Sequence, residues 1–223
     1  FKPTFFSIWK QNDQAEIQKQ WFGRTVIHSD RRFTYEEAQE RIETGKGDLA
    51  EEINALDKLA KIMRNERIRK GAITFDRSEV RFNLDENNEP IGVYFKISKD
   101  ANHLIEEFML LANRKVSEYV SLNRKGEHTN NTFIYRVHDD PDPVKLEALR
   151  DFVGTFGYKM NIANTKQTTE SMNALLKGVK GKPEENMIET LAMRSMSKAV
   201  YSTDPIGHYG LGFEYYSDRK SVV

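Results

Sequence analysis

The 223-residue sequence contains no cysteine. This absence excludes disulfides, thiolate zinc sites, iron–sulfur clusters and a cysteine nucleophile, and it favours a reducing compartment. We therefore expect a cytoplasmic protein. No apolar run approaches the ~18 residues of a membrane span, and the mean hydropathy is −0.69, so we expect no membrane association. Net charge is also missing, because 34 Lys and Arg balance 34 Asp and Glu.

Several catalytic motifs are missing as well. There is no phosphate-binding loop, no dinucleotide-binding glycine pattern and no Gly-x-Ser-x-Gly turn, and the five histidines are scattered singly. Asp139, Asp140 and Asp142 have two interpretations. They could hold two divalent ions, or they could form the solvated start of a helix, which the interleaved prolines favour.

The hydrophobic pattern predicts an α+β fold. Alternation predicts strands, and apolar residues at helical spacing predict helices. The predicted strands span residues 5–9, 17–28, 80–84, 91–97 and 132–137, and the predicted helices span 35–43, 48–70, 100–119, 144–157, 168–179 and 183–197. No repeat or linker marks a domain boundary. We expect the helices to pack on one side of a mixed sheet.

One polar stripe is predicted on the helix that begins near residue 100. Asn102, Glu106, Asn113 and Ser117 recur at helical spacing between apolar flanks. The stripe is either a solvated face or a carboxylate and amides presented to a polar ligand.

Aromatic and basic residues give a second set of candidates. Tyr35 and Phe75 are either core aromatics or rings that stack on nucleic-acid bases. The basic candidates for phosphate contacts are Arg31, Arg32 and the basic run within residues 64–70. The run could instead compensate the dipole of the helix that it ends.

Three segments, taken together, resemble a known family. They are GAITF at residues 71–75 with the hairpin and DANHLIEEFMLLANRKVSEYV after it, FIYRVHDDPDPVKLEALRDFVGTFGY at 133–158, and MRSMSKAVYSTDPIGHYGLGFEYY at 193–216. Their order and spacing are similar to the catalytic (RNB) domain of the ribonuclease II and ribonuclease R family of 3′→5′ exoribonucleases. The RVH and GHYGLGFEYY segments are nearer to ribonuclease R. The resemblance implies an incomplete RNB-type α+β fold.

The resemblance also implies site residues. Tyr35, Phe75 and Glu106 occupy positions that line the family's buried RNA channel near the cleavage site. Tyr35 and Phe75 would stack on or position terminal bases, and Glu106 would hydrogen-bond to sugar or base. His208 is a further RNA-binding candidate, with a buried structural histidine as the alternative. The implied partner is single-stranded RNA, and we expect a monomer.

The family's catalytic groups have no counterpart here. Its D-x-x-D-x-D-D cluster, which holds magnesium for two-metal hydrolysis, and its phosphate-holding arginine motif are absent from these residues. We therefore expect no catalytic residue and no metal ligand in this chain, with Mg²⁺ bound by residues outside it. Residues 1–217 would be a partial RNB domain. Residues 218–223 match the translation of a common sequencing adapter, so we expect a non-biological tail, a natural truncation being the alternative.

The implied parent is a processive enzyme that degrades single-stranded RNA to 5′-mononucleotides, while the 223 residues alone would be inactive. Two alternatives remain. One is a non-catalytic RNA-binding module on the same scaffold, and the other is a helical interaction protein with a chance resemblance.

Overall fold

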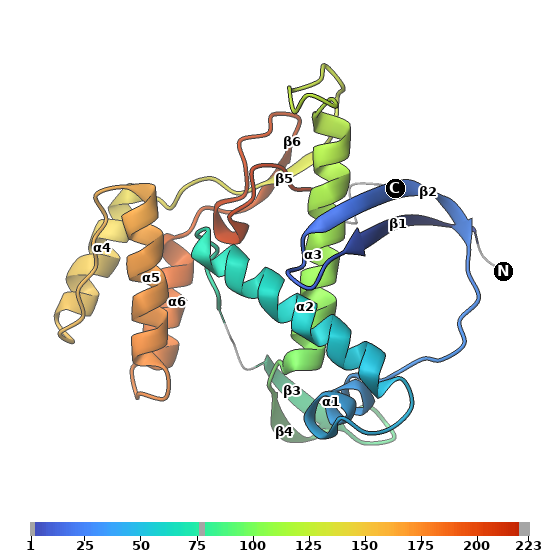
Figure 1. The fold of residues 1–223 in the computed structure, drawn as a ribbon. Helices are drawn as coiled ribbons and strands as arrows, with labels where there is room; N and C mark the ends of the chain where they lie inside the picture. The colour runs from blue at the N-terminus through green and yellow to red at the C-terminus, as the bar shows by residue number, and fades with distance from the viewer. Residues whose placement is uncertain (1–2, 76–78, 219–223) are drawn as a thin grey trace. The chain divides into compact units, whose positions relative to one another are not determined.

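A computed structural model describes residues 3–75 and 79–218 (Figure 1). The chain divides into two compact units. The first unit comprises residues 1–64 and 76–110, and the second comprises residues 65–75 and 111–223. The elements of the described part are β1 (Pro3–Gln11), β2 (Ile17–Val26), α1 (Tyr35–Thr44), α2 (Ala50–Arg69), β3 (Glu79–Leu84), β4 (Pro90–Lys96), α3 (Asp100–Ser121), β5 (Tyr135–Val137), α4 (Pro143–Gly154), α5 (Thr165–Val179), α6 (Glu185–Ser195), β6 (Val200–Ser202) and the 3₁₀ helix η1 (Tyr209–Leu211).

The α+β class is confirmed, but the strands are not joined into one mixed sheet. Within the described residues they form three separate antiparallel pairs, β1–β2, β3–β4 and β5–β6. Two of these pairs are hairpins, because a short turn brings the next strand alongside. The only parallel pairing among the described residues is an isolated bridge between His138 and His208.

The start of α1 follows from local hydrogen bonding. The Thr34 side chain accepts from the Glu37 N–H, and the Glu37 carboxylate accepts from the Thr34 N–H. This reciprocal pair satisfies backbone donors that the first helical turn leaves unpaired. The helix ends at Gly45, whose φ of 67° is left-handed. The helix predicted over residues 35–43 is confirmed.

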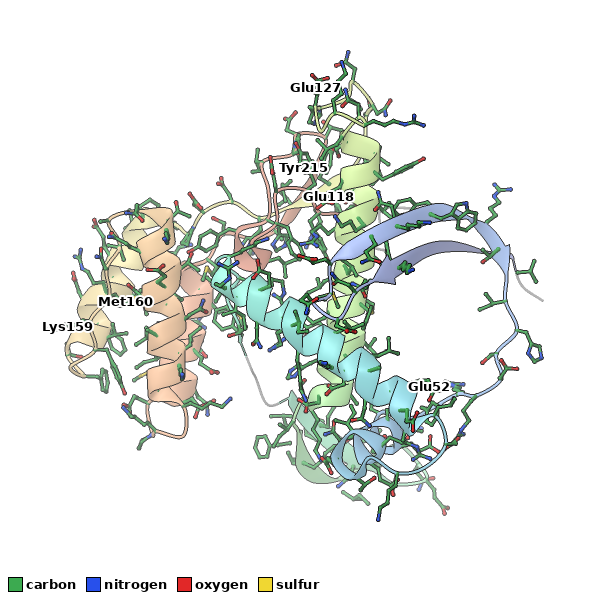
Figure 2. All side chains as sticks on the ribbon, in the orientation of Figure 1. Glu52, Glu118, Glu127, Lys159, Met160 and Tyr215 are labelled. Atoms are coloured by element: carbon green, nitrogen blue, oxygen red, sulfur yellow. The ribbon has the colours of Figure 1, made fainter. Side chains whose placement is uncertain are left out.

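The core of the second unit lies among α4, α5 and α6. Its buried side chains come mainly from these helices, and Met160, labelled in Figure 2, lies between α4 and α5 in the chain. The buried members are Ile73, Leu146, Leu149, Val153, Met160, Met172, Leu175, Leu176, Val179, Ile188 and Ala192. Two predicted helix starts were displaced: α5 begins at Thr165 behind an Asn164 cap, and α6 begins at Glu185 rather than Pro183.

The acidic turn before α4 is a helix start. Asp142 accepts hydrogen bonds from the N–H groups of Val144 and Lys145, and Pro143 occupies the first turn. These bonds, led by the one from Lys145, hold the pKa of Asp142 below its usual range. The structure therefore favours the capping interpretation of this turn over a two-metal cluster.

The β3–β4 hairpin exposes a wide apolar face. Val80 pairs with Phe95 and Phe82 with Val93, and opposite residues of an antiparallel pair lie on the same face. All four of these side chains are more than half exposed. The hairpin therefore presents apolar side chains to solvent.

The last residue that the structure describes is Asp218. The Tyr201 hydroxyl donates to the Asp218 carboxylate over 2.9 Å, so one residue of the expected tail is described, whereas 219–223 lie outside the described residues. Among the described helices, none has the length and hydropathy needed to cross a membrane.

Candidate functional site

Tyr35 and Glu106 belong to the first unit. Tyr35 is the first residue of α1, directly after the Thr34 cap, and 44% of the residue is exposed. The structure therefore does not support a core role for Tyr35. Its ring is accessible to a ligand.

Glu106 lies on the exposed side of α3 and is oriented by a cation. Arg64 of α2 places Nη1 3.6 Å from the Glu106 carboxylate and 3.5 Å from that of Glu107. The Glu106 side chain is 46% exposed, whereas that of Glu107 is only 3% exposed. Glu106 can therefore still accept hydrogen bonds from a ligand, while the buried carboxylate of Glu107 helps to hold Arg64 in place.

The sequence did not single out Glu107. Glu107 lies three residues after Leu104 and four before Leu111, which are both buried on the same helical face. This spacing could have predicted that Glu107 is buried. A carboxylate on such a face needs a cation or hydrogen-bond donors. Arg64 meets that need.

The predicted polar stripe of α3 is neither uniformly solvated nor uniformly available to a ligand. Asn102 accepts from a backbone N–H at the start of the helix. Asn113 donates to the Tyr216 hydroxyl over 3.5 Å, and Ser117 is buried and donates to the backbone of α3. Of the four predicted positions, only Glu106 is exposed, so it is the residue of the stripe that can contact a ligand.

Phe75 belongs to the second unit and packs, partly buried, against its core. It directly follows a segment held by backbone hydrogen bonds. The Ile73 N–H donates to the carbonyl of Gly210 over 3.0 Å, and the Ala72 carbonyl accepts from the Asn173 side chain over 2.9 Å. The core-aromatic interpretation is thus correct in part, because Phe75 packs against the core without being fully buried.

His208 caps η1 and lies among other rings of the second unit. Its Nδ1 accepts from the Leu211 N–H over 3.3 Å, and its ring centroid lies 5.0 Å from that of His138 and 5.2 Å from that of Tyr216. Burial, followed by repulsion from His138 and Arg136, lowers the pKa of His208 from 6.5 to about 4. A neutral, packed imidazole is typical of a structural histidine.

A pocket of about 640 Å³ opens beside His208 within the second unit. The end of α2, the first turns of α5 and the loop around η1 line it. Cations and carboxylates are mixed in the lining, so it has no single sign of charge: Arg69, Lys70, Lys166, Asp139, Asp140, Glu170 and Glu214. Across the described residues, no three His, Asp or Glu groups are arranged to hold a metal ion.

Comparison with known proteins links this geometry to one family. The sequence matches the RNB domain over residues 1–221. It is 32% identical to ribonuclease R of Aquifex aeolicus over 89% of this chain and 28% of that protein. It is 34% identical to the exosome complex exonuclease RRP44 of Homo sapiens over 99% of this chain and 23% of that protein. The chain therefore spans about a quarter of the length of these relatives.

Solved structures share the fold. The apo form of Mycoplasma genitalium RNase R matches with a TM-score of 0.83 and 23% identity, covering 99% of this chain and 34% of that one. The same protein in complex with ribose-methylated single-stranded RNA matches with a TM-score of 0.81 and 23% identity, covering 97% and 34%. Yeast Ssd1, described as a pseudonuclease, matches with a TM-score of 0.67 and 17% identity, covering 96% and 26%.

Proposed function

The chain belongs to the RNB domain family, and on that premise we propose that it is part of a processive 3′→5′ exoribonuclease. The substrate is single-stranded RNA and the products are 5′-mononucleotides. The observation that carries this proposal is the family match along residues 1–221, together with exoribonuclease relatives that align over most of the chain.

In this proposal the chain holds and orients RNA through Tyr35, Phe75 and Glu106. The exposed ring of Tyr35 and the accessible side of Phe75 stack on bases, and each stacked base contributes about 1–3 kcal/mol. The Glu106 carboxylate, oriented by Arg64, accepts hydrogen bonds from 2′-hydroxyl or base N–H groups. The burial of His208 supports a role in shaping the η1 loop rather than direct RNA contact.

Magnesium does not fit the residues described here. Asp142 is occupied as the cap of α4, and the described part of the chain has no cluster of three or more ligating groups. We propose that the two Mg²⁺ ions of the hydrolysis are held by residues outside these 223 residues. Two-metal chemistry would supply the activated water and stabilise the leaving oxygen. The residues of this chain would bind and orient the RNA.

The test is a digestion of 5′-labelled single-stranded RNA with added Mg²⁺. We expect the purified 223-residue chain to leave the RNA intact. The polypeptide translated from the complete reading frame should shorten it from the 3′ end. Magnesium-dependent release of 5′-mononucleotides by the 223-residue chain would refute the proposed division of labour.

A non-catalytic RNA-binding module is the second candidate. The likeness of the fold to Ssd1 favours it, since that protein is described as a pseudonuclease. The codons that precede Phe1 discriminate between the candidates, because an encoded aspartate cluster supports hydrolysis. The third possibility, a chance resemblance, is excluded by the family match.

We further propose a cytoplasmic monomer that acts in RNA degradation. The absence of cysteine supports a reducing compartment. Sedimentation of the complete protein tests the monomer, and fractionation of cells tests the compartment.

A further inference from the structure

The segment before Phe75 is fixed from two sides. On one side, the Ile73 N–H donates to the Gly210 carbonyl over 3.0 Å. On the other, the Asn173 side chain bonds to the residues before and after Ile73. Three consecutive backbone groups are therefore bonded in alternation, as in a central strand between two neighbours.

Asn173 uses both halves of its amide. Its NH₂ group donates to the Ala72 carbonyl over 2.9 Å, and its carbonyl oxygen accepts from the Thr74 N–H over 3.4 Å. Helix α5 places Asn173 one residue after Met172, which is fully buried in the core. The amide thus extends from a rigid helix and takes the place of a neighbouring strand.

The opposite side of the segment is equally close-packed. A Cβ added at Gly212 would lie 3.1 Å from the Ala72 nitrogen, and Gly212 has a φ of +66°. A Cβ added at Gly210 would lie 2.9 Å from His138 Nδ1, which accepts the Gly210 N–H over 3.0 Å. Gly212 therefore lies so close to the segment that a side chain at this position would be crowded and strained.

Ile73 and Phe75 both contact the core of the second unit. Because the backbone of residues 72–74 is bonded on both sides, Asn173 and Gly210 restrict the conformation of the chain that leads into Phe75. Loss of either bond frees two backbone torsions next to Phe75 and adds conformational entropy that RNA binding must then remove.

We propose that Asn173 is a positioning residue for RNA binding: it sets the orientation in which Phe75 offers its ring to an RNA base. This inference rests on the proposed role of Phe75 in stacking. Asn173 itself acts through the backbone of residues 72–74.

The test is a double-mutant cycle on the 223-residue chain. The readout is the dissociation constant of fluorescein-labelled single-stranded oligoadenylate, measured by fluorescence anisotropy at low salt. The proteins are wild type, Asn173→Ala, Phe75→Ala and the double variant. Asn186→Ala on α6 is the matched control, since Asn186 is an exposed helical asparagine. Thermal unfolding of each protein is recorded in parallel.

We expect Phe75→Ala to weaken binding about tenfold, within the range for loss of one stacked base. Asn173→Ala should weaken it about three- to tenfold in the wild-type background and leave it unchanged in the Phe75→Ala background, because its effect passes through that ring. Asn173→Asp keeps the acceptor for Thr74 and loses the donor to Ala72, so its affinity should be intermediate. It also replaces Asn173→Ala if that variant does not fold.

Each other outcome overturns the inference in a distinguishable way. If Asn173→Ala binds with wild-type affinity while Phe75→Ala binds more weakly, Asn173 does not position Phe75. The proposed function is then unaffected. Equal losses in both backgrounds mean that Asn173 acts on folding or on RNA directly. Unchanged binding by Phe75→Ala, or no binding by wild type, removes the proposed role of Phe75 and with it the inference.

Discussion

Acidification should destabilise the second unit through His208. Its pKa is about 4 in the folded chain, against 6.5 for a free imidazole. Between these values the unfolded chain binds more protons, so the free energy of unfolding rises with pH in this window. The stabilisation is fully present above about pH 6.5 and is lost as the pH falls toward 4.

The size of the effect follows from the shift. Integrated over the titration, it corresponds to about 2 kcal/mol of lost stability between about pH 7 and about pH 5. His208→Asn should remove most of this loss, because asparagine does not titrate and its carbonyl can still accept from the Leu211 N–H. Urea denaturation, followed by far-ultraviolet circular dichroism at both pH values, measures the difference.

His28→Asn is the matched control, because the His28 side chain is 73% exposed. Carboxylates and other histidines also titrate over this range. The comparison is therefore between variants rather than between pH values alone. Equal losses of stability on acidification in His208→Asn, the wild type and the His28 variant would show that His208 does not cause the loss.

Three further predictions concern single side chains. Thr34→Ala removes the capping box of α1 and should lower the free energy of unfolding by about 1 kcal/mol in urea titrations; an unchanged midpoint would contradict the role of the cap. Tyr135→Phe deletes a buried hydroxyl 2.6 Å from Ser121 Oγ and should cost about 1 kcal/mol, whereas the exposed Tyr119→Phe should cost far less; equal effects would count against the buried bond. Glu106→Ala in the complete protein should slow RNA degradation in a gel-based assay, and an unchanged rate would argue for a purely structural Glu106.

The elements that the sequence predicted are those with local causes. The cap at Thr34 needs only the glutamate three residues later, and the Asp142–Pro143 start of α4 needs only its own first turn. Long helices such as α2 and α3 were predicted because their apolar spacing repeats over several turns.

The features that the sequence did not predict depend on distant partners. Strand β6 has only three residues, and it is defined by pairing with β5 rather than by a pattern of its own. Asn173 is 101 residues from the carbonyl that it binds. The capping role of His208 also depends on the η1 turn. Such contacts require the folded chain, because spacing in one sequence carries no information about them.

The candidate site shows the same division. Phe75 and Glu106 were found through segments that resemble the family, while the residues that support them, Asn173 and Arg64, were not assigned these roles.

We propose that Tyr35, Phe75 and Glu106 position single-stranded RNA in a 3′→5′ exoribonuclease. The most direct measurement is the product pattern when the protein from the complete reading frame digests 5′-labelled single-stranded RNA in the presence of Mg²⁺. We expect full-length RNA to give way to short 5′-labelled end products with few intermediates, unlabelled 5′-mononucleotides to be released, and the reaction to be slower for Phe75→Ala. Intact RNA, or internal cleavage without mononucleotides, would contradict it.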